Sequence, residues 1–158
     1  MFRELVRKNK QLSQEECIRL LTEEKRGVLS VLGDDDYPYG MPMNHYYNEQ
    51  DGCLYFHCGR QGHRIDALRR CEKASFCVYN EGERAPGEWA FCVKSVIVFG
   101  RVEIVEEPTV LREITTALSL KFTQDEEYIR QEIEQYAKET LLLRLLPENM
   151  CGKMVKEA

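Results

Sequence analysis

The segment from Phe91 to Val105 constrains the fold of this chain more than any other. It is apolar on both faces around Val96 to Phe99, whereas a strand with one wet face alternates apolar and polar residues. A small barrel can cover one face of such a strand, and a second copy of the chain can cover the other. The segment therefore predicts a long central strand and a homodimer.

The rest of the chain divides into short extended segments separated by turn residues. Pro38 and Pro42 exclude a helix between Tyr37 and Tyr47 and suit a sheet edge. Six extended segments are predicted, at residues 28–32, 37–47, 53–58, 74–79, 91–105 and 141–146. Helices are expected between and around them, without regular strand–helix alternation. This pattern favours a mainly β fold, a six-stranded antiparallel barrel with flanking α-helices.

Capping patterns indicate where two of the helices begin. Ser13 with Glu16, and Thr123 with Glu126, have the form of a capping box, in which each side chain satisfies a free amide of the first turn. Gly27 is placed to end the first of these helices.

Composition bounds the class of protein. The 158 residues, 18.5 kDa in mass, contain no linker or repeat, so we expect a single domain over 1–158. With 27 acidic and 22 basic residues the net charge is -5, which argues against a nucleic-acid partner. No apolar run is long enough to span a bilayer, and the basic N-terminus lacks the apolar stretch of a signal peptide. We therefore expect a soluble, cytoplasmic protein without a membrane partner.

The cysteines do not suggest a disulfide framework or a metal centre. Their number, seven, is odd. Four lie inside apolar patterns, where free cysteine packs as a small hydrophobe: Cys17, Cys71, Cys77 and Cys92. Cys53, His57 and Cys58 are close in sequence, but strand alternation sends Cys58 to the opposite face, and no second pair completes a tetrahedral shell. No metal is therefore expected.

The stretch YFHCGRQGHR, Tyr55 to Arg64, is the most informative for chemistry. A strand leads into a glycine loop, the loop opens a helix of about ten residues, and cations lie at that opening. The first amides of a helix lack internal partners and favour an anion. Gly62 lets backbone approach a phosphate, and His63 and Arg64 can donate charge-assisted hydrogen bonds to it. The alternative is an ordinary surface helix with solvated cations.

Known catalytic motifs are missing from the sequence. The loop matches neither the Walker pattern nor the G-x-G-x-x-G fingerprint. Two of the three histidines, His57 and His63, flank it and would respond to a phosphate near physiological pH. No Ser-His-Asp order, carboxylate pair or H-E-x-x-H helix is present, so a hydrolytic triad is not supported and no catalytic residue is assigned.

Five ordered pieces of the sequence carry a resemblance to a known family. They are MFRELVRKNKQLSQEEC, YPYGMPMNHYY, FHCGRQGHRIDALRR, EKASFCV and SVIVFGRVEIVEE. In this order they resemble pyridoxamine 5'-phosphate oxidase-like flavoproteins, most closely the nitroimidazole-resistance branch. The likeness extends to about Pro108 and then loosely to Gly152-Lys153. It implies a split β-barrel that binds FMN at the interface of a homodimer.

The resemblance also assigns site residues. The strand whose backbone meets the edge of the flavin corresponds to Pro42, Met43, Asn44 and His45, and the end of the next strand to His57 and Cys58. His45 is a candidate proton donor only because it lies on the flavin-side strand.

The remaining positions concern the phosphate and the partner subunit. The pair of basic residues that binds phosphate falls on His63 and Arg64, which agrees with the anion site argued above. The polar residue that reaches the flavin from the partner falls on Ser95, preceded by Lys94. The arginine set and the C-terminal signature of the vitamin B6 oxidases are absent, so oxidation of vitamin B6 is not expected.

Three functions are compatible with these features. The first is an FMN-dependent oxidoreductase acting on a small molecule such as a nitroaromatic or nitroimidazole compound, with the flavin supplying the electron chemistry. The second is a non-catalytic flavin or haem binding protein, or a redox sensor, on the same barrel. The third is a β-barrel interaction domain whose anion loop is incidental.

Overall fold

Two long antiparallel strands, β7 and β8, lie side by side in the middle of the sheet. The computed structural model describes residues 1–157, in which β7 (Phe91–Val105) pairs with β8 (Thr140–Glu157) along nearly its full length. The register shifts between Phe99 and Gly100. A Cβ on Gly100 would lie 2.1 Å from the carbonyl oxygen of Leu146, so only glycine allows the two strands to approach this closely here.

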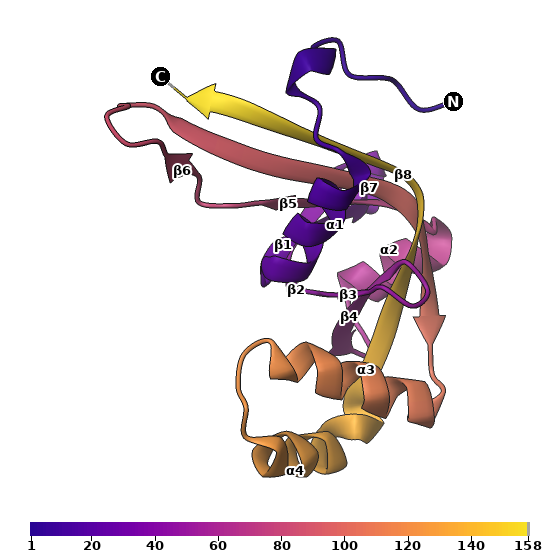
Figure 1. Ribbon diagram of the computed structural model, residues 1–158. Coiled ribbons are helices and arrows are strands. Elements are labelled where there is room, and N and C mark those ends of the chain that lie inside the picture. Colours follow the sequence, from indigo (N-terminus) through magenta and orange to yellow (C-terminus); the bar gives the residue numbers. More distant parts are fainter. Residues whose placement is uncertain (158) are drawn as a thin grey trace.

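The other strands complete one curled antiparallel sheet (Figure 1). They are β1 (Arg26–Leu32), β2 (Pro38–Asn44), β3 (Tyr46–Asn48), β4 (Cys53–Gly59), β5 (Lys73–Tyr79) and β6 (Glu83–Arg84). The strand order is β2-β1-β5-β7-β8-β4-β3, with β6 on β7, so β2 and β3 lie at the two ends of this order. The expected mainly β antiparallel fold with flanking helices is confirmed.

The sheet has eight strands rather than the expected six. The segment 37–47 divides at His45 into β2 and β3, and β6 is a two-residue strand. The last strand was expected to end at Leu146 but continues to Glu157, with Gly152 opposite Val96. Its second half has no apolar alternation and is ordered by hydrogen bonding to β7, which is why the sequence pattern missed it.

Four α-helices flank the sheet: α1 (Gln14–Glu23), α2 (His63–Arg70), α3 (Pro108–Leu120) and α4 (Glu126–Tyr136). The capping box of Ser13 and Glu16 is confirmed, with both hydrogen bonds present. The predicted capping box of Thr123 and Glu126 is wrong. Asp125 is the N-cap of α4, and its side chain accepts a hydrogen bond from the amide of Tyr128 at 3.0 Å. No helix in the described part of the chain is long and apolar enough to cross a membrane.

Gly27 does not end α1, as the sequence had suggested, but lies within β1. The helix ends at Glu23, and Glu24 is already extended. A Cβ at Gly27 would lie 2.5 Å from the ring of Phe76 on the neighbouring strand. The glycine therefore serves close strand packing rather than helix termination.

Two hydrophobic clusters hold these elements together. The larger includes Phe56 and Phe76, whose rings meet edge to face with centroids 4.9 Å apart. The smaller lies under α3 and includes Tyr55 and Ile114. Figure 1 shows α3 and α4 together at the end of the molecule away from the N-terminal segment.

Candidate functional site

The start of α2 has the geometry that the anion prediction requires. Gly62 is its N-cap, with φ of 115° and no side-chain hydrogen bond to the first turn, whereas Ser13 caps α1 and Asp125 caps α4. The Gly62 carbonyl accepts a hydrogen bond from the amide of Ile65. The amides that precede Ile65 in the first turn have no partner within the helix. No atom lies within 4 Å of a Cβ built on Gly62, so the backbone is open to a ligand.

Arg64 extends from this helix start between two sulfur atoms. Its Nε lies 3.0 Å from Sδ of Met41 on β2. Burial raises the pKa of the Cys58 thiol on β4, and the nearby guanidinium of Arg64 partly offsets this rise. Among residues 1–157 Arg64 forms no ion pair, whereas Arg70 of the same helix pairs with Asp34 at 2.9 Å. A half-buried guanidinium without a carboxylate is suited to a bound anion.

His63 is held by its neighbours rather than directed at the open loop. Its ring stacks on Tyr39, with centroids 4.2 Å apart. Its Nε2 accepts from the amide of Asp34 at 3.2 Å, and the Asp34 carboxylate lies 3.6 Å away. The backbone amide of His63 belongs to the first turn of α2, while its imidazole fixes the turn that precedes β2. Arg64 is therefore the stronger cationic ligand of the pair.

The residues predicted on β2 and β4 divide into two groups. Asn44 and His57 line a common cavity of about 300 Å³ beside α3 and α4, and Pro42 is exposed. The side chains of Met43 and His45 are buried in the core. His57 is exposed, but the protein atoms around its ring, and then the charge of Arg64, lower its pKa. The fold thus brings Asn44, His57 and the start of α2 to one region.

The His45 side chain is fully buried and does not face a ligand site. Its Nε2 lies 2.8 Å from the carbonyl oxygen of Leu21, and its ring meets Phe76 edge to face. Burial, and then the charge of Lys121, lower the pKa of His45 to about 4. The neutral imidazole donates to Leu21, and Nδ1 has no partner in residues 1–157. This position does not support the suggestion that His45 donates a proton to a ligand.

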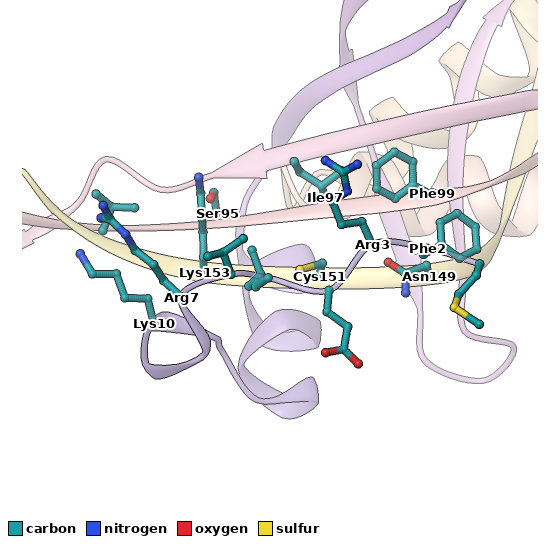
Figure 2. A pocket seen from close by; sticks show the side chains of 15 residues that line it. Phe2, Arg3, Arg7, Lys10, Ser95, Ile97, Phe99, Asn149, Cys151 and Lys153 are labelled. Carbon is teal, nitrogen blue, oxygen red and sulfur yellow. The ribbon is translucent and has the colours of Figure 1, made fainter.

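Lys94 and Ser95 lie on opposite faces of β7 and away from α2. Lys94 points toward α1, where its Nζ lies 3.4 Å from Glu16. Ser95 is on the outer face and lines a second cavity, of about 680 Å³, between β7, β8 and the N-terminal segment (Figure 2). A contact of Ser95 with a ligand at α2 therefore requires a second copy of the chain.

The second cavity also contains cations that the sequence reasoning missed. Arg3, Arg7, Lys10 and Lys153 line it together with a single acid, Glu4, which is paired with Lys8 at 2.8 Å. Figure 2 shows Arg7, Lys10 and Lys153 on the side of the cavity where Ser95 lies. Lys153 is opposite Ser95 in the β7–β8 register, a relationship that depends on the unexpected second half of β8.

Metal ligands are not gathered anywhere in the described part of the chain. Residues 1–157 contain no group of three or more histidine, cysteine or acidic side chains placed to hold an ion. All seven cysteines are free thiols.

Comparisons with solved structures show how widely this fold is shared. A protein from Bacteroides thetaiotaomicron assigned to 5-nitroimidazole antibiotic resistance is 17% identical, with a TM-score of 0.76 over 93% of this chain and 87% of that one. A conserved hypothetical protein of Mycobacterium tuberculosis is 19% identical, with a TM-score of 0.79 over 95% and 90%. An FAD-binding protein from Mesorhizobium loti is 23% identical, with a TM-score of 0.70 over 92% and 97%.

Sequence comparison gives a complementary result. No curated protein matches the chain. The family model described as pyridoxamine 5'-phosphate oxidase matches residues 13–154, which include every strand but the end of β8, and all four α-helices. The resemblance inferred from the sequence is thereby confirmed, and the chain belongs to the pyridoxamine 5'-phosphate oxidase family.

Proposed function

We propose that this protein binds FMN, with the phosphate at the start of α2. The observation that carries the proposal is the uncapped first turn at Gly62 beside Arg64, which forms no ion pair among residues 1–157. Family membership and the similarity to FAD-binding proteins from Mesorhizobium loti and Mycobacterium smegmatis support a flavin as the ligand. The first-turn amides and the guanidinium are the donors that a phosphate favours.

The flavin ring would extend from α2 toward β2. This strand is at one end of the sheet order, so its outer edge keeps backbone groups that β1 does not use. Pro42 and Asn44 are accessible on it, and His57 lies nearby on β4. Met43 and His45 would contribute through the backbone, since their side chains belong to the core.

A homodimer completes the proposed site. Ile97 and Phe99 on the outer face of β7 alternate with the buried Val96 and Val98. The ring of Phe99 stacks on Phe2 of the N-terminal segment, with centroids 5.6 Å apart, yet Ile97 and Phe99 remain 36% and 39% exposed. Such an apolar row is suited to burial against the same face of a second copy. In this arrangement Ser95 and the cations around it would approach the flavin of the partner.

The proposed activity is oxidation or reduction of a small molecule. A bound flavin supplies the electron transfer, and the protein binds and orients the reactants. The similarity to the 5-nitroimidazole resistance protein favours a nitroaromatic compound as the electron acceptor.

One spectroscopic experiment tests these proposals in order. The purified protein, loaded with FMN, is reduced with NADH or NADPH and then mixed with a nitroaromatic compound. Bleaching followed by recovery of the flavin bands is expected for an oxidoreductase. A protein that holds FMN but is neither bleached nor reoxidised would be a non-catalytic flavin binder, and a protein that does not bind FMN would overturn the proposal.

A further inference from the structure

The cavity of about 680 Å³ on the outer face of β7 and β8 has the N-terminal segment, residues 1–7, as one wall. Its floor consists of alternate residues of the two strands, among them Ile97 and the opposite Cys151. The chain reaches this face past the edge of β8 that β7 does not occupy, where the amide of Leu12 donates to the carbonyl of Gly152 at 3.0 Å. The volume is within the range of sites that hold small ligands or cofactors.

Four cations line this cavity, and none of them is neutralised by a neighbour. Arg3, Arg7, Lys10 and Lys153 form no ion pair among residues 1–157. Lys10 is half-buried and the other three are exposed. The chain as a whole has a net charge of -5, so this cluster is not a consequence of a basic composition. Like charges held together repel one another, and an anion in the cavity would relieve that repulsion.

The carboxylates around the cavity are paired or lie outside it. Glu4, the one acid in the lining, is 2.8 Å from Lys8. Glu148, next to the first residues of the chain, is 2.6 Å from Arg101. Glu157 lies beyond the last residue of β8 that lines the cavity. The side chains of the lining therefore have a net positive charge, which favours a ligand with more than one negative charge.

The cavity is cationic at one end and aromatic at the other. Three of the cations gather beside Ser95, while Phe2 and Phe99 lie at the opposite end (Figure 2). The stacked rings of Phe2 and Phe99 remain 41% and 39% exposed, so a planar group can pack on their outer surfaces. Ser95 and Phe99 are four residues apart on β7, which is about 13 Å along an antiparallel strand. An extended nucleoside diphosphate, with a base at one end and two phosphates at the other, has a comparable length and the same division of charge.

We propose that this cavity binds the adenosine diphosphate group of a dinucleotide, the group that NADH, NADPH and FAD share. The phosphates lie among the cations beside Ser95, and the adenine packs on Phe2 and Phe99. The inference rests on the proposed function, in which a flavin needs a reductant. In the proposed homodimer the cations of one copy approach the flavin of the other, so a dinucleotide held here would extend toward that flavin.

The test compares ADP with adenosine, using the FMN-loaded protein and no reductant. Isothermal titration calorimetry is expected to show ADP binding at least about ten-fold more tightly than adenosine, because the cations act on the phosphates. Lys153→Gln should weaken ADP binding about five- to ten-fold, as expected for one charged contact that water partly screens. Arg7→Gln should have a similar effect, since it removes a cation from the other wall.

Lys156→Gln is the matched control. It removes a lysine of the same strand whose side chain pairs with Glu88 outside the cavity, and it should leave ADP binding unchanged. No ADP binding by the wild type, or equal losses in Lys153→Gln and Lys156→Gln, would overturn the site.

Two titrations of the flavin-free protein identify the molecule that supplies the group. If a reductant supplies it, ADP displaces NADH or NADPH, as followed by nicotinamide fluorescence, and Lys153→Gln weakens binding of the same reductant. If the flavin supplies it, FAD binds more tightly than FMN, and Lys153→Gln removes the difference. ADP binding accompanied by neither result would overturn the assignment to a dinucleotide.

FMN titration of the same variants separates this inference from the proposed function. Lys153-dependent ADP binding by a protein that does not bind FMN would retain the nucleotide site and overturn the proposed function. A loss of FMN binding in Lys153→Gln as large as the loss of ADP binding would have the opposite meaning. The cations would then serve the phosphate of FMN, and the separate nucleotide site would be wrong.

Discussion

The guanidinium of Arg64 and the thioether of Met41 are in direct contact, with Nε 3.0 Å from Sδ. Met41 is buried in β2, so this contact holds the guanidinium end of the arginine side chain against the core. It joins the start of α2 to the strand along which the flavin ring is proposed to lie. A cation held in this way is preorganised for an anion, because little side-chain freedom remains to be lost on binding.

Arg64→Ala is expected to weaken FMN binding and to leave riboflavin binding nearly unchanged. One charge-assisted contact to phosphate contributes about 1.5 to 3 kcal/mol, or about ten- to a hundred-fold in affinity. Arg64→Lys should keep part of this, since a point charge remains. Fluorescence titration with both ligands measures the effect. Arg69→Ala, in the last turn of α2, is the control, and equal losses for FMN and riboflavin would contradict the phosphate assignment.

Gly62→Ala is expected to weaken FMN binding through the backbone alone. The left-handed φ of 115° strains any residue with a Cβ, at a cost of about 1 to 3 kcal/mol, although the space around the position is open. Gly59→Ala is the matched control, because its position is equally open and has no such φ. FMN titration and thermal unfolding of both variants make the measurement. If the Gly62→Ala protein is as stable as the Gly59→Ala protein and binds FMN as tightly, this backbone conformation has no role in FMN binding.

His45 is expected to make the folded protein less stable in mild acid. Its folded pKa is about 4 and its ordinary value is 6.5, so the unfolded chain binds the proton first as pH falls between these values. The stability is complete above pH 6.5 and declines by up to about 3 kcal/mol as pH approaches 4. Urea unfolding at several pH values measures the slope. His45→Asn, which does not titrate, should be less stable at pH 7 but show a shallower decline, and an unchanged slope would contradict the assignment.

The outer face of β7 is expected to form the dimer interface. Sedimentation at micromolar concentration should give about 37 kDa, twice the mass of the 18.5 kDa chain. Phe99→Asp places a charge on the apolar row and should shift the protein toward monomer. Leu32→Asp, at a similarly exposed position at the end of β1, is the control. A monomeric wild type would remove the basis for a contact between Ser95 and the flavin of a partner.

Much of the fold could be predicted because the relevant forces act over a few residues. The capping box of Ser13 and Glu16 needs only the four residues it spans, and the β7 segment is recognisable from its own apolar pattern. The opening of α2 follows in the same way from Gly62 and the cations after it. The sequence also carried the family resemblance, which the family model confirms over residues 13–154.

Tertiary structure alone decided the features that depend on distant partners. The second half of β8 is a strand because β7 offers it hydrogen bonds, and the Gly27 position is required by the ring of Phe76, 49 positions along the chain. His45 seemed accessible from its strand, yet Leu21 and Phe76 enclose it. The cavity that Asn44 and His57 share exists only where α3 and α4 meet the ends of β2 and β4. Burial depends on contacts between residues far apart in the chain, and the pattern of neighbouring residues does not contain them.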